Sequence, residues 1–320
     1  MQREEVVIMR KTIRIGVVLL VLGLILTMFG IANNGIQSIY WEQGFHIVRH
    51  RSRSYHVSQL KKITLDTSSN IIIKQGTSTK ITVTAARTFP KIKTSHGHLT
   101  ITSTADDSHS VGFMFGNAGQ YTDTTTITVP KGTTVEKVTA ESDQTGNLSL
   151  QNVTVDQLNV FNDDADVNLS NVKINQSMAL SGGNIRLSRV SAPSLQIAGD
   201  PDVSVTNSHF TTAASKITTD EGDIHLTNNR FKALRMTTSD GDILFNNNRI
   251  TDSLSASTSD GDIRGTAPRT TGIHANTSDG DLNIFGHHAN DNGVYQVNPS
   301  AASQYRLSTN DGDITVTSSN

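Results

Sequence analysis

Five short acidic segments in the second half of the chain carry the residue types that could do chemistry. Three of them read Ser-Asp-Gly-Asp, at 239–242, 259–262 and 278–281, and variants occupy 220–223 and 310–313. Carboxylates at such spacing can ligate a hard cation such as Ca²⁺, serve as the paired acids of a glycoside hydrolase, or accept backbone hydrogen bonds in turns. The choice among these roles decides what class of protein this is.

The turn interpretation fits the residue order best. Asp before Gly favours a turn, because the Asp side chain accepts backbone N–H groups and Gly can adopt a positive φ. The segment also recurs five times, whereas a catalytic centre needs only one asymmetric arrangement. We therefore expect architectural corners, no catalytic residue and no cofactor.

Calcium is the second interpretation. Carboxylates stacked about 4.8 Å apart repel by about 1 kcal/mol per pair even in water, and a Ca²⁺ ion between them would remove that penalty. The candidate ligands are Asp240, Asp242, Asp260, Asp262, Asp279 and Asp281. The Gly-Gly-x-Gly-x-Asp spacing of calcium-binding solenoid repeats is absent from the sequence.

A carbohydrate-active enzyme is the third interpretation. Asp240 and Asp260 could approach the ~5 Å carboxylate separation of a retaining glycosidase. The sequence contains no nucleophile elbow, Walker loop or His-Glu-x-x-His helix. His287 and His288 would point to opposite sides of a strand, so we expect an exposed loop pair there.

A nearly constant interval between the acidic segments points to the elements that hold them. Their glycines at 222, 241, 261 and 280 are 19, 20 and 19 residues apart, a fifth stands at 312, and the same stride backwards reaches 201, 183, 165 and 146. Two residues after each of these nine markers stands an aliphatic residue: Leu148, Val167, Ile185, Val203, Ile224, Ile243, Ile263, Leu282 and Ile314. A further alternating residue follows most of them, which indicates a strand with one buried face.

A second alternating pair precedes many markers, so each unit holds two strands. Such a unit cannot enclose a core alone, but stacking units about 4.8 Å apart builds a continuous one. The sequence therefore predicts an all-β fold, a single-stack β-solenoid (β-helix) of about 19-residue rungs over 136–320. Residues 60–135 alternate less regularly and are expected to form irregular opening rungs or a capping sheet.

Five asparagines fall six residues after their markers, at 152, 171, 207, 228 and 247. In stacked rungs they would superimpose. Their amides would then form a hydrogen-bonded ladder, or they would be solvated turn residues.

An apolar N-terminal segment predicts attachment to a membrane. Residues 15–32 contain no charge and would span about 27 Å as a helix, close to the ~30 Å of a bilayer core. Four basic residues precede this segment and the next follows only at Arg49, so residues 1–14 are expected in the cytoplasm and the C-terminal domain outside the cell. Residues 33–59 would be a juxtamembrane linker. A cleaved signal peptide is the alternative, although the apolar run is longer than the usual ~7–15 residues.

Charge is divided unevenly along the chain. Residues 33–135 carry 11 basic and 5 acidic side chains, whereas residues 136–320 carry 12 and 22, a net charge of −10. The basic segment could rest against anionic lipid or a polyanionic cell-wall polymer, and the acidic segment would be repelled by both. Nucleic acid is therefore not expected as a partner. Without cysteine, no disulfide or thiolate metal site can form.

Two insertions interrupt the regular background. Residues 106–121 carry Val111, Phe113, Met114 and Phe115 as an apolar tip between glycines, and residues 287–303 lengthen the last interval. Either insertion would fold back to cover an end or edge of the solenoid, or would contact a partner or a membrane surface.

The segment Thr128-Val129-Pro130-Lys131-Gly132 followed by the serial acidic glycine turns resembles the bacterial "putative adhesin" family, a domain of unknown function. The resemblance covers roughly residues 60–320. It implies a membrane-anchored β-solenoid of the cell envelope, similar to components of envelope-stress operons, with no assigned catalytic residue. Ala165 and Pro201 depart from the pattern at marker positions.

Three functions follow as hypotheses. The first is a non-enzymatic, membrane-tethered extracellular solenoid that acts as an adhesin-like or envelope-interaction scaffold. The second is an envelope-stress regulator or sensor that contacts another membrane protein. The third is a carbohydrate-active β-helix. The sequence does not decide the oligomeric state.

Overall fold

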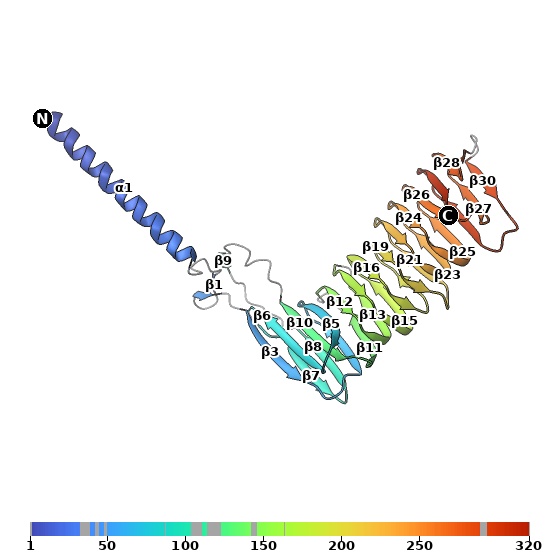
Figure 1. Cartoon of the computed structure of the whole chain (residues 1–320), viewed down its shortest axis with the longest axis horizontal. Helices are drawn as coiled ribbons and strands as arrows, with labels where there is room; N and C mark the ends of the chain where they lie inside the picture. Colours follow the sequence, from blue (N-terminus) through green and yellow to red (C-terminus); the bar gives the residue numbers. More distant parts are fainter. Residues whose placement is uncertain are drawn as a thin grey trace. The chain divides into compact units, whose positions relative to one another are not determined.

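The computed structural model describes residues 2–32, 39–41, 45–47, 50–86, 88–103, 111–113, 123–141, 146–162, 164–288 and 293–319 (Figure 1). The chain divides into two compact units. One comprises residues 1–50 and 106–122, and the other comprises residues 51–105 and 123–320.

The smaller unit contains the helix α1 (Gln2–Ala32) and a three-stranded antiparallel sheet. In the sheet, β1 (Ile39–Trp41) lies between β2 (Phe45–Ile47) and β9 (Val111–Phe113). The large apolar side chains of α1 from Ile15 to Phe29 are exposed. In α1 the structure describes the side chains of residues 15–30 and 32 only. Among the described residues, no helix is long and apolar enough to cross a membrane.

The larger unit is built from two long sheets whose strands are mostly parallel (Figure 1). In the described part of the chain, the first is a 14-stranded sheet. Its strands, in spatial order, are β29 (His287–His288), β28 (Leu282–Ile284), β32 (Ile314–Ser318), β26 (Ile263–Ala267), β24 (Ile243–Asn246), β22 (Ile224–Thr227), β19 (Asp202–Thr206), β16 (Asn184–Ser188), β14 (Val167–Ser170), β12 (Leu148–Gln151), β5 (Asn70–Gly76), β10 (Thr124–Pro130), β6 (Lys80–Ala85) and β3 (Arg51–His56).

The second is a 15-stranded sheet, again counted over the described residues. Its main path is β30 (Val294–Val297), β27 (Gly272–Asn276), β31 (Gln304–Ser308), β25 (Arg249–Ser257), β23 (Arg230–Thr237), β20 (His209–Phe210), β17 (Ser191–Ala192), β15 (Lys173–Ser181), β13 (Thr154–Phe161), β11 (Thr134–Glu141), β4 (Lys62–Asp66), β8 (His98–Thr102) and β7 (Lys91–Ser95). Off this path, β18 (Gln196–Ile197) and β21 (Ser215–Thr218) continue two rungs in which the strand is broken.

The stacked-rung prediction is confirmed by the strand pairing. Each regular rung contributes to both sheets, with a broken strand in the 15-stranded sheet in two rungs, and equivalent residues of successive rungs pair in register, as in Ile224↔Ile243 and Ile243↔Ile263. All nine aliphatic residues that follow the markers are buried, with 3% exposure or less. Gly265, which interrupts the next column, makes room for the ring of Phe245, because a Cβ there would overlap that ring. The core therefore runs as continuous aliphatic columns between the two sheets.

The order of the last rungs differs from the sequential order that the repeat predicts. β32 pairs with β26 on one side and with β28 on the other, and β31 likewise lies between β25 and β27. The C-terminal rung is therefore intercalated between two rungs that precede it in the sequence. At the opposite end, β4 lies between β8 and β11 in one sheet, and β5 lies between β10 and β12 in the other. All four of these neighbours come later in the sequence than β4 and β5.

Antiparallel strands cover the ends of the stack. At the C-terminal end, β29 pairs with β28 and β30 with β27, so the described parts of the insertion at 287–303 cover both sheet edges. At the other end, β3 and β6 in one sheet and β7 in the other pair antiparallel. Such strands protect a parallel stack from adding further chains at its edges.

Candidate functional site: the acidic corners

The acidic segments form one of the two corners of each late rung, where the chain passes from the 15-stranded to the 14-stranded sheet. We call residues 219–223, 238–242, 258–262, 309–313 and 277–281 the acidic corners, in their spatial order. Each contains a Thr, then a Gly, then an Asp that directly precedes the buried aliphatic residue. The register of the flanking strands superimposes these three positions from rung to rung.

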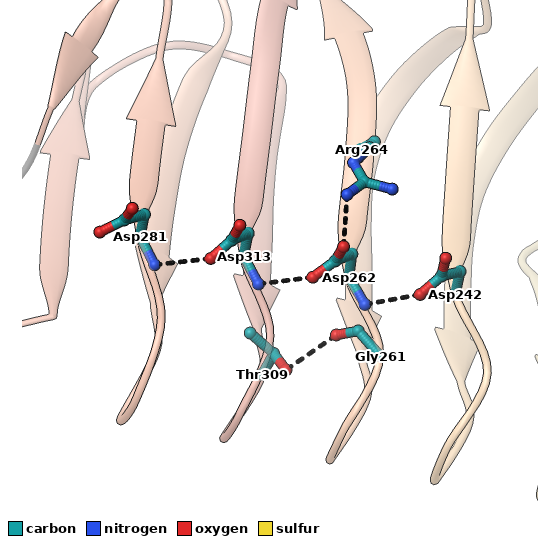
Figure 2. Close-up of polar contacts among 7 residues, drawn as sticks. All are labelled: Asp242, Gly261, Asp262, Arg264, Asp281, Thr309 and Asp313. Carbon is teal, nitrogen blue, oxygen red and sulfur yellow. Dashed lines mark hydrogen bonds and ion pairs between the residues drawn. The ribbon is translucent and has the colours of Figure 1, made fainter.

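The last Asp of each acidic corner forms a ladder with its equivalents (Figure 2). The backbone N–H of Asp262 donates to Oδ1 of Asp242 at 2.8 Å, that of Asp313 to Asp262 at 2.7 Å, and that of Asp281 to Asp313 at 2.8 Å. The carboxylate of one rung thus accepts the N–H of the same position in the next rung. Like charges can stack here because each carboxylate is hydrogen-bonded to a backbone dipole.

The same ladder continues into rungs whose corners lack the acidic motif. The N–H of Asp242 donates to Asp223 at 2.9 Å, and that of Asp223 to Asp202 at 3.0 Å. Further along, the N–H of Asp166 donates to the side-chain oxygen of Asn147 at 2.9 Å. Because an amide oxygen serves as well as a carboxylate, the position requires an acceptor and not a negative charge.

A second ladder is formed by buried threonines inside the acidic corners. Oγ1 of Thr258 accepts the N–H of Gly261 at 3.2 Å and donates to the carbonyl of Gly241 in the neighbouring rung at 3.1 Å. Thr309 donates in the same way to the carbonyl of Gly261 at 3.0 Å (Figure 2). The threonine therefore joins its own corner to the neighbouring one. The sequence interpretation did not single out this position, although a Thr stands three residues before each of these glycines.

The glycines of the acidic corners are required for close approach, and the expectation of a positive φ is wrong. None of the five, at 222, 241, 261, 280 and 312, is among the described glycines with positive φ. A Cβ on Gly261 would overlap the carbonyl oxygen of Gly241, and one on Gly241 would overlap that of Gly222. Successive corners are stacked so closely that only hydrogen fits between the backbones.

Asp200 terminates the stack of acidic corners. Its Oδ1 accepts the N–H groups of Glu221 at 2.6 Å, Asp220 at 3.1 Å and Gly222 at 3.3 Å, together with the hydroxyl of Thr219 at 3.2 Å. In later rungs a backbone carbonyl accepts the equivalent N–H groups. The N–H groups of Ser239 and Asp240, for example, both donate to the carbonyl of Asp220. The N–H of Glu221 is the largest cause that lowers the pKa of the exposed Asp200 carboxylate below 3.8, and desolvation opposes it.

The calcium candidates are split between two environments. Asp242, Asp262 and Asp281 belong to the ladder, whereas Asp240, Asp260 and Asp279 are exposed at the corner tips. Asp262 also forms an ion pair with Arg264. Over the described residues, no three His, Asp or Glu side chains converge as a metal-binding group. The ladder geometry uses carboxylate oxygens as acceptors of backbone N–H groups.

The opposite corner contains the expected asparagines, and both of the expected roles occur among them. All five, at 152, 171, 207, 228 and 247, have positive φ values between 52° and 58°, a conformation that Asn tolerates, so they are turn residues. Among the five expected asparagines, one amide–amide hydrogen bond is described, from Asn171 to Asn152 at 2.7 Å. The prediction of a ladder is thus correct for one pair.

A buried amide ladder lies one position later, where sequence reasoning missed it. The N–H of Asn229 donates to Oδ1 of Asn248 at 2.9 Å, and that of Ser208 donates to Oδ1 of Asn229 at 2.9 Å. The side-chain Nδ2 groups of Asn229 and Asn248 donate to backbone carbonyls of the 14-stranded sheet. The doubled Asn-Asn at 228–229 and 247–248 was the available signal.

The apolar tip falls partly outside the described residues. Val111 and Phe113 lie in β9, which pairs with β1, and Met114 and Phe115 lie outside the described residues. A contact of this tip with a partner stays a prediction. His287 and His288 are exposed in β29. The ring of His287 stacks on that of Tyr295, with 6.4 Å between the ring centroids.

A family model described as Toastrack DUF4097 matches residues 60–317 of the chain. No curated protein matches the sequence. Solved structures to which the chain is similar include a "putative adhesin" from Bacteroides fragilis, with 16% identity, coverage of 84% of this chain and 97% of that chain, and a TM-score of 0.41. A "putative adhesin" from Parabacteroides distasonis has 15% identity, coverage of 84% and 97%, and a TM-score of 0.44. A "putative lipid binding protein" from the same organism has 12% identity, coverage of 85% and 97%, and a TM-score of 0.42.

Proposed function

Because the chain belongs to the Toastrack DUF4097 family, whose model covers residues 60–317, we propose that it is a non-enzymatic scaffold of the bacterial cell envelope. In this proposal the solenoid stands outside the cell, is tethered by the N-terminal helix, and acts in an adhesin-like manner by presenting its sheets to other envelope components.

The observation that carries the non-enzymatic role is the state of the acidic corners. The ladder carboxylates Asp242, Asp262 and Asp313 each accept a backbone N–H from the neighbouring rung. The ladder continues through an amide at Asn147, where no acid–base role is available. A position that accepts either Asp or Asn is used for hydrogen bonding, whereas a glycosidase requires an ionisable group at both of its sites.

The tether rests on the sequence of the helix. Residues 15–32 are uncharged, basic residues precede them, and the apolar side chains from Ile15 to Phe29 are exposed in α1. Burial in a bilayer would remove this apolar surface from water. The positive-inside rule then assigns the solenoid to the outer side of the membrane.

Protease accessibility in cells tests the tether and its orientation. The full chain with a C-terminal epitope is expressed in bacteria, and we expect the epitope to sediment with membranes after alkaline carbonate extraction and to be removed by protease added outside intact cells or protoplasts. A variant with Leu19→Lys and Leu22→Lys should be released from the membrane. Release of the unmodified chain, or protection of its epitope, would reject the tethered orientation.

Adhesion is tested with the same cells. Cells that display the solenoid should bind envelope or matrix material more than cells with the Leu19→Lys/Leu22→Lys variant. Equal binding by both would reject the scaffold function, and a change confined to the stress response would support the envelope-stress alternative. Cleavage of a glycan by the purified chain, abolished by Asp240→Asn, would instead establish an enzyme.

A further inference from the structure

The charges of the solenoid are separated onto different surfaces. The carboxylates gather in the acidic corners, whereas seven exposed cations lie in the strands of the 15-stranded sheet from β15 onward. One of them, Lys232, stands outside the two rows described below. The other six, which we call the cationic face, are Lys173, Lys216, Arg230, Arg235, Arg249 and Arg306. Within the described strands of this sheet from β15 to β30, Asp252 is the one carboxylate. The outer side of the sheet is therefore strongly positive although residues 136–320 carry a net negative charge.

Strand register arranges these cations in two rows along the stack. The first row runs through consecutive rungs from Lys173 through Ser191, His209 and Arg230 to Arg249. At about 4.8 Å per rung it spans about 19 Å.

The second row runs from Lys216 through Arg235 and Ser255 to Arg306, and it spans about 14 Å at the same spacing. The rows follow the long axis of the stack, so a linear ligand could contact several cations at once.

The cations of this face are not neutralised by the protein. Among the described residues, ion pairs within 4.0 Å are formed by Lys61, Arg186 and Arg264, none of which belongs to the cationic face. The many nearby carboxylates stay at the acidic corners, where the ladder holds them against backbone N–H groups. Adjacent like charges repel, and a polyanion that neutralised them would release counterions and bind favourably.

Both ends of the first row open into hollows of the surface. A hollow of 280 Å³ is lined by Lys173, Arg189 and Ser191. A larger pocket of 840 Å³ is lined by Arg249, Asn248, Ser303 and Tyr305. The larger pocket lies beside the intercalated C-terminal rung, between residues 247–251 and 301–303. Its lining combines the guanidinium of Arg249 with several amide and hydroxyl side chains, so it suits a ligand with charged or hydroxyl groups better than an apolar one.

We propose that the cationic face binds a linear, phosphate-bearing polyanion that lies along the stack from Lys173 to Arg249. Guanidinium and ammonium groups bind phosphate oxygens through charge-assisted hydrogen bonds, and arginine does so with two parallel donors. The neighbouring outward positions, such as Ser255, Gln196 and Thr251, supply further hydrogen-bonding groups. This inference deepens the proposed function and rests on it, because an exported scaffold would meet its polyanion in the cell envelope.

The arrangement also changes an expectation from the sequence. A net charge of −10 over residues 136–320 predicted repulsion of polyanions by this segment. Net charge is a poor guide when the two signs lie on different surfaces, because the field beyond about 8 Å to 10 Å is screened at physiological salt. A polyanion on the cationic face would therefore respond mainly to the cations beneath it.

Binding of long-chain inorganic polyphosphate by the purified full-length chain in nonionic detergent tests the proposal. The test variant carries Arg230→Gln, Arg235→Gln and Arg249→Gln. The matched control carries Lys74→Gln, Lys80→Gln and Lys131→Gln in or beside strands of the 14-stranded sheet, and it changes the net charge by the same amount.

We expect the test variant to bind at least about 10-fold more weakly and the control to change by less than about 2-fold. The slope of log K against log salt should fall by about 2 for the test variant, since about 0.7 is lost per phosphate contact on a single strand. Far-UV circular dichroism of both variants verifies that the solenoid is folded.

Three outcomes would overturn the proposal: no binding by the unmodified chain, equal weakening in both variants, or competition by anionic phospholipid vesicles that bind more tightly than polyphosphate. The last outcome would identify a membrane surface as the ligand of this face. Display on the cell surface is measured independently, so failure of polyphosphate binding would leave the proposed scaffold function standing.

Discussion

The role of the acidic corners can be tested at Asp242 with two substitutions that separate hydrogen bonding from charge. The carboxylate of Asp242 accepts the N–H of Asp262 at 2.8 Å, and its own N–H donates to Asp223 at 2.9 Å. Asp242→Asn keeps an oxygen acceptor in this place and removes the charge. Asp242→Ala removes both.

Both variants lose the charge, so the difference in stability between them measures the hydrogen-bond acceptor alone. Carboxylates on neighbouring rungs about 4.8 Å apart repel by about 0.9 kcal/mol per pair in water, so Asp242→Asn relieves up to about 1.7 kcal/mol before salt screening. We expect it to be as stable as the unmodified chain or up to about 1 kcal/mol more stable. Asp242→Ala leaves the N–H of Asp262 without its acceptor, which costs about 1–3 kcal/mol.

Urea unfolding followed by far-UV circular dichroism, in chelator and in millimolar calcium, measures this difference. A structural ladder predicts that the free energy of unfolding of Asp242→Asn exceeds that of Asp242→Ala by at least about 1 kcal/mol. It also predicts that calcium changes none of the unfolding curves. If Asp242→Asn were as damaging as Asp242→Ala, and calcium stabilised only the unmodified chain, the carboxylates would be metal ligands and the reasoning from the ladder would fail.

Four further changes have defined outcomes. Gly261→Ala should lower the free energy of unfolding by about 2–4 kcal/mol in urea, because its Cβ overlaps the carbonyl of Gly241, whereas Gly286→Ala, with φ +86° and open space around it, should cost only about 1 kcal/mol. Asp200→Asn should make the free energy of unfolding less dependent on pH on the acid side. Because the pKa of the Asp200 carboxylate is lowered in the folded state, the stability that it adds is complete above the ordinary pKa of 3.8 and is lost as the pH falls through the folded-state pKa. Burial raises the pKa of the Tyr305 hydroxyl from 10 to about 12. The stability that this group contributes is therefore complete below pH 10 and lost towards pH 12, and the free energy of unfolding of Tyr305→Phe should fall less steeply over this range. A chain that ends after residue 303 lacks β31 and β32 and should elute as aggregates from a sizing column; a monomer with an unchanged melting temperature would contradict the intercalated order.

The repeat was predictable because its determinants are local. Alternating aliphatic residues and a fixed interval specify which residues face the core, and the structure buries all of them. The order of the rungs was not predictable in the same way. Ile263 would pair equally well with Leu282 or with Ile314, since every rung presents a similar aliphatic face, and only the 32-residue interval before Gly312 hinted at a detour.

The candidate site was predictable in its architectural role and not in its mechanism. The sequence shows a Gly at each corner but does not show whether it serves backbone conformation or close contact, and the structure assigns close contact. Two adjacent asparagines likewise look alike in a sequence. The structure gives positive φ to Asn228 and a buried ladder position to Asn229, because the chain turns between them.

The intercalated rung makes completion of the stack depend on β31 and β32. While the protein is being synthesised or exported from its N-terminus, β25 and β26 pair with the preceding rung but lack their partners on the other side until residues 304–318 have emerged. In the folded chain the β27–β28 rung docks against those strands, so a product that stops before them lacks this docking surface and keeps an unpaired edge that favours aggregation. Residues 304–318 thereby close the gap in the stack, and the β27–β28 rung joins the solenoid only through them.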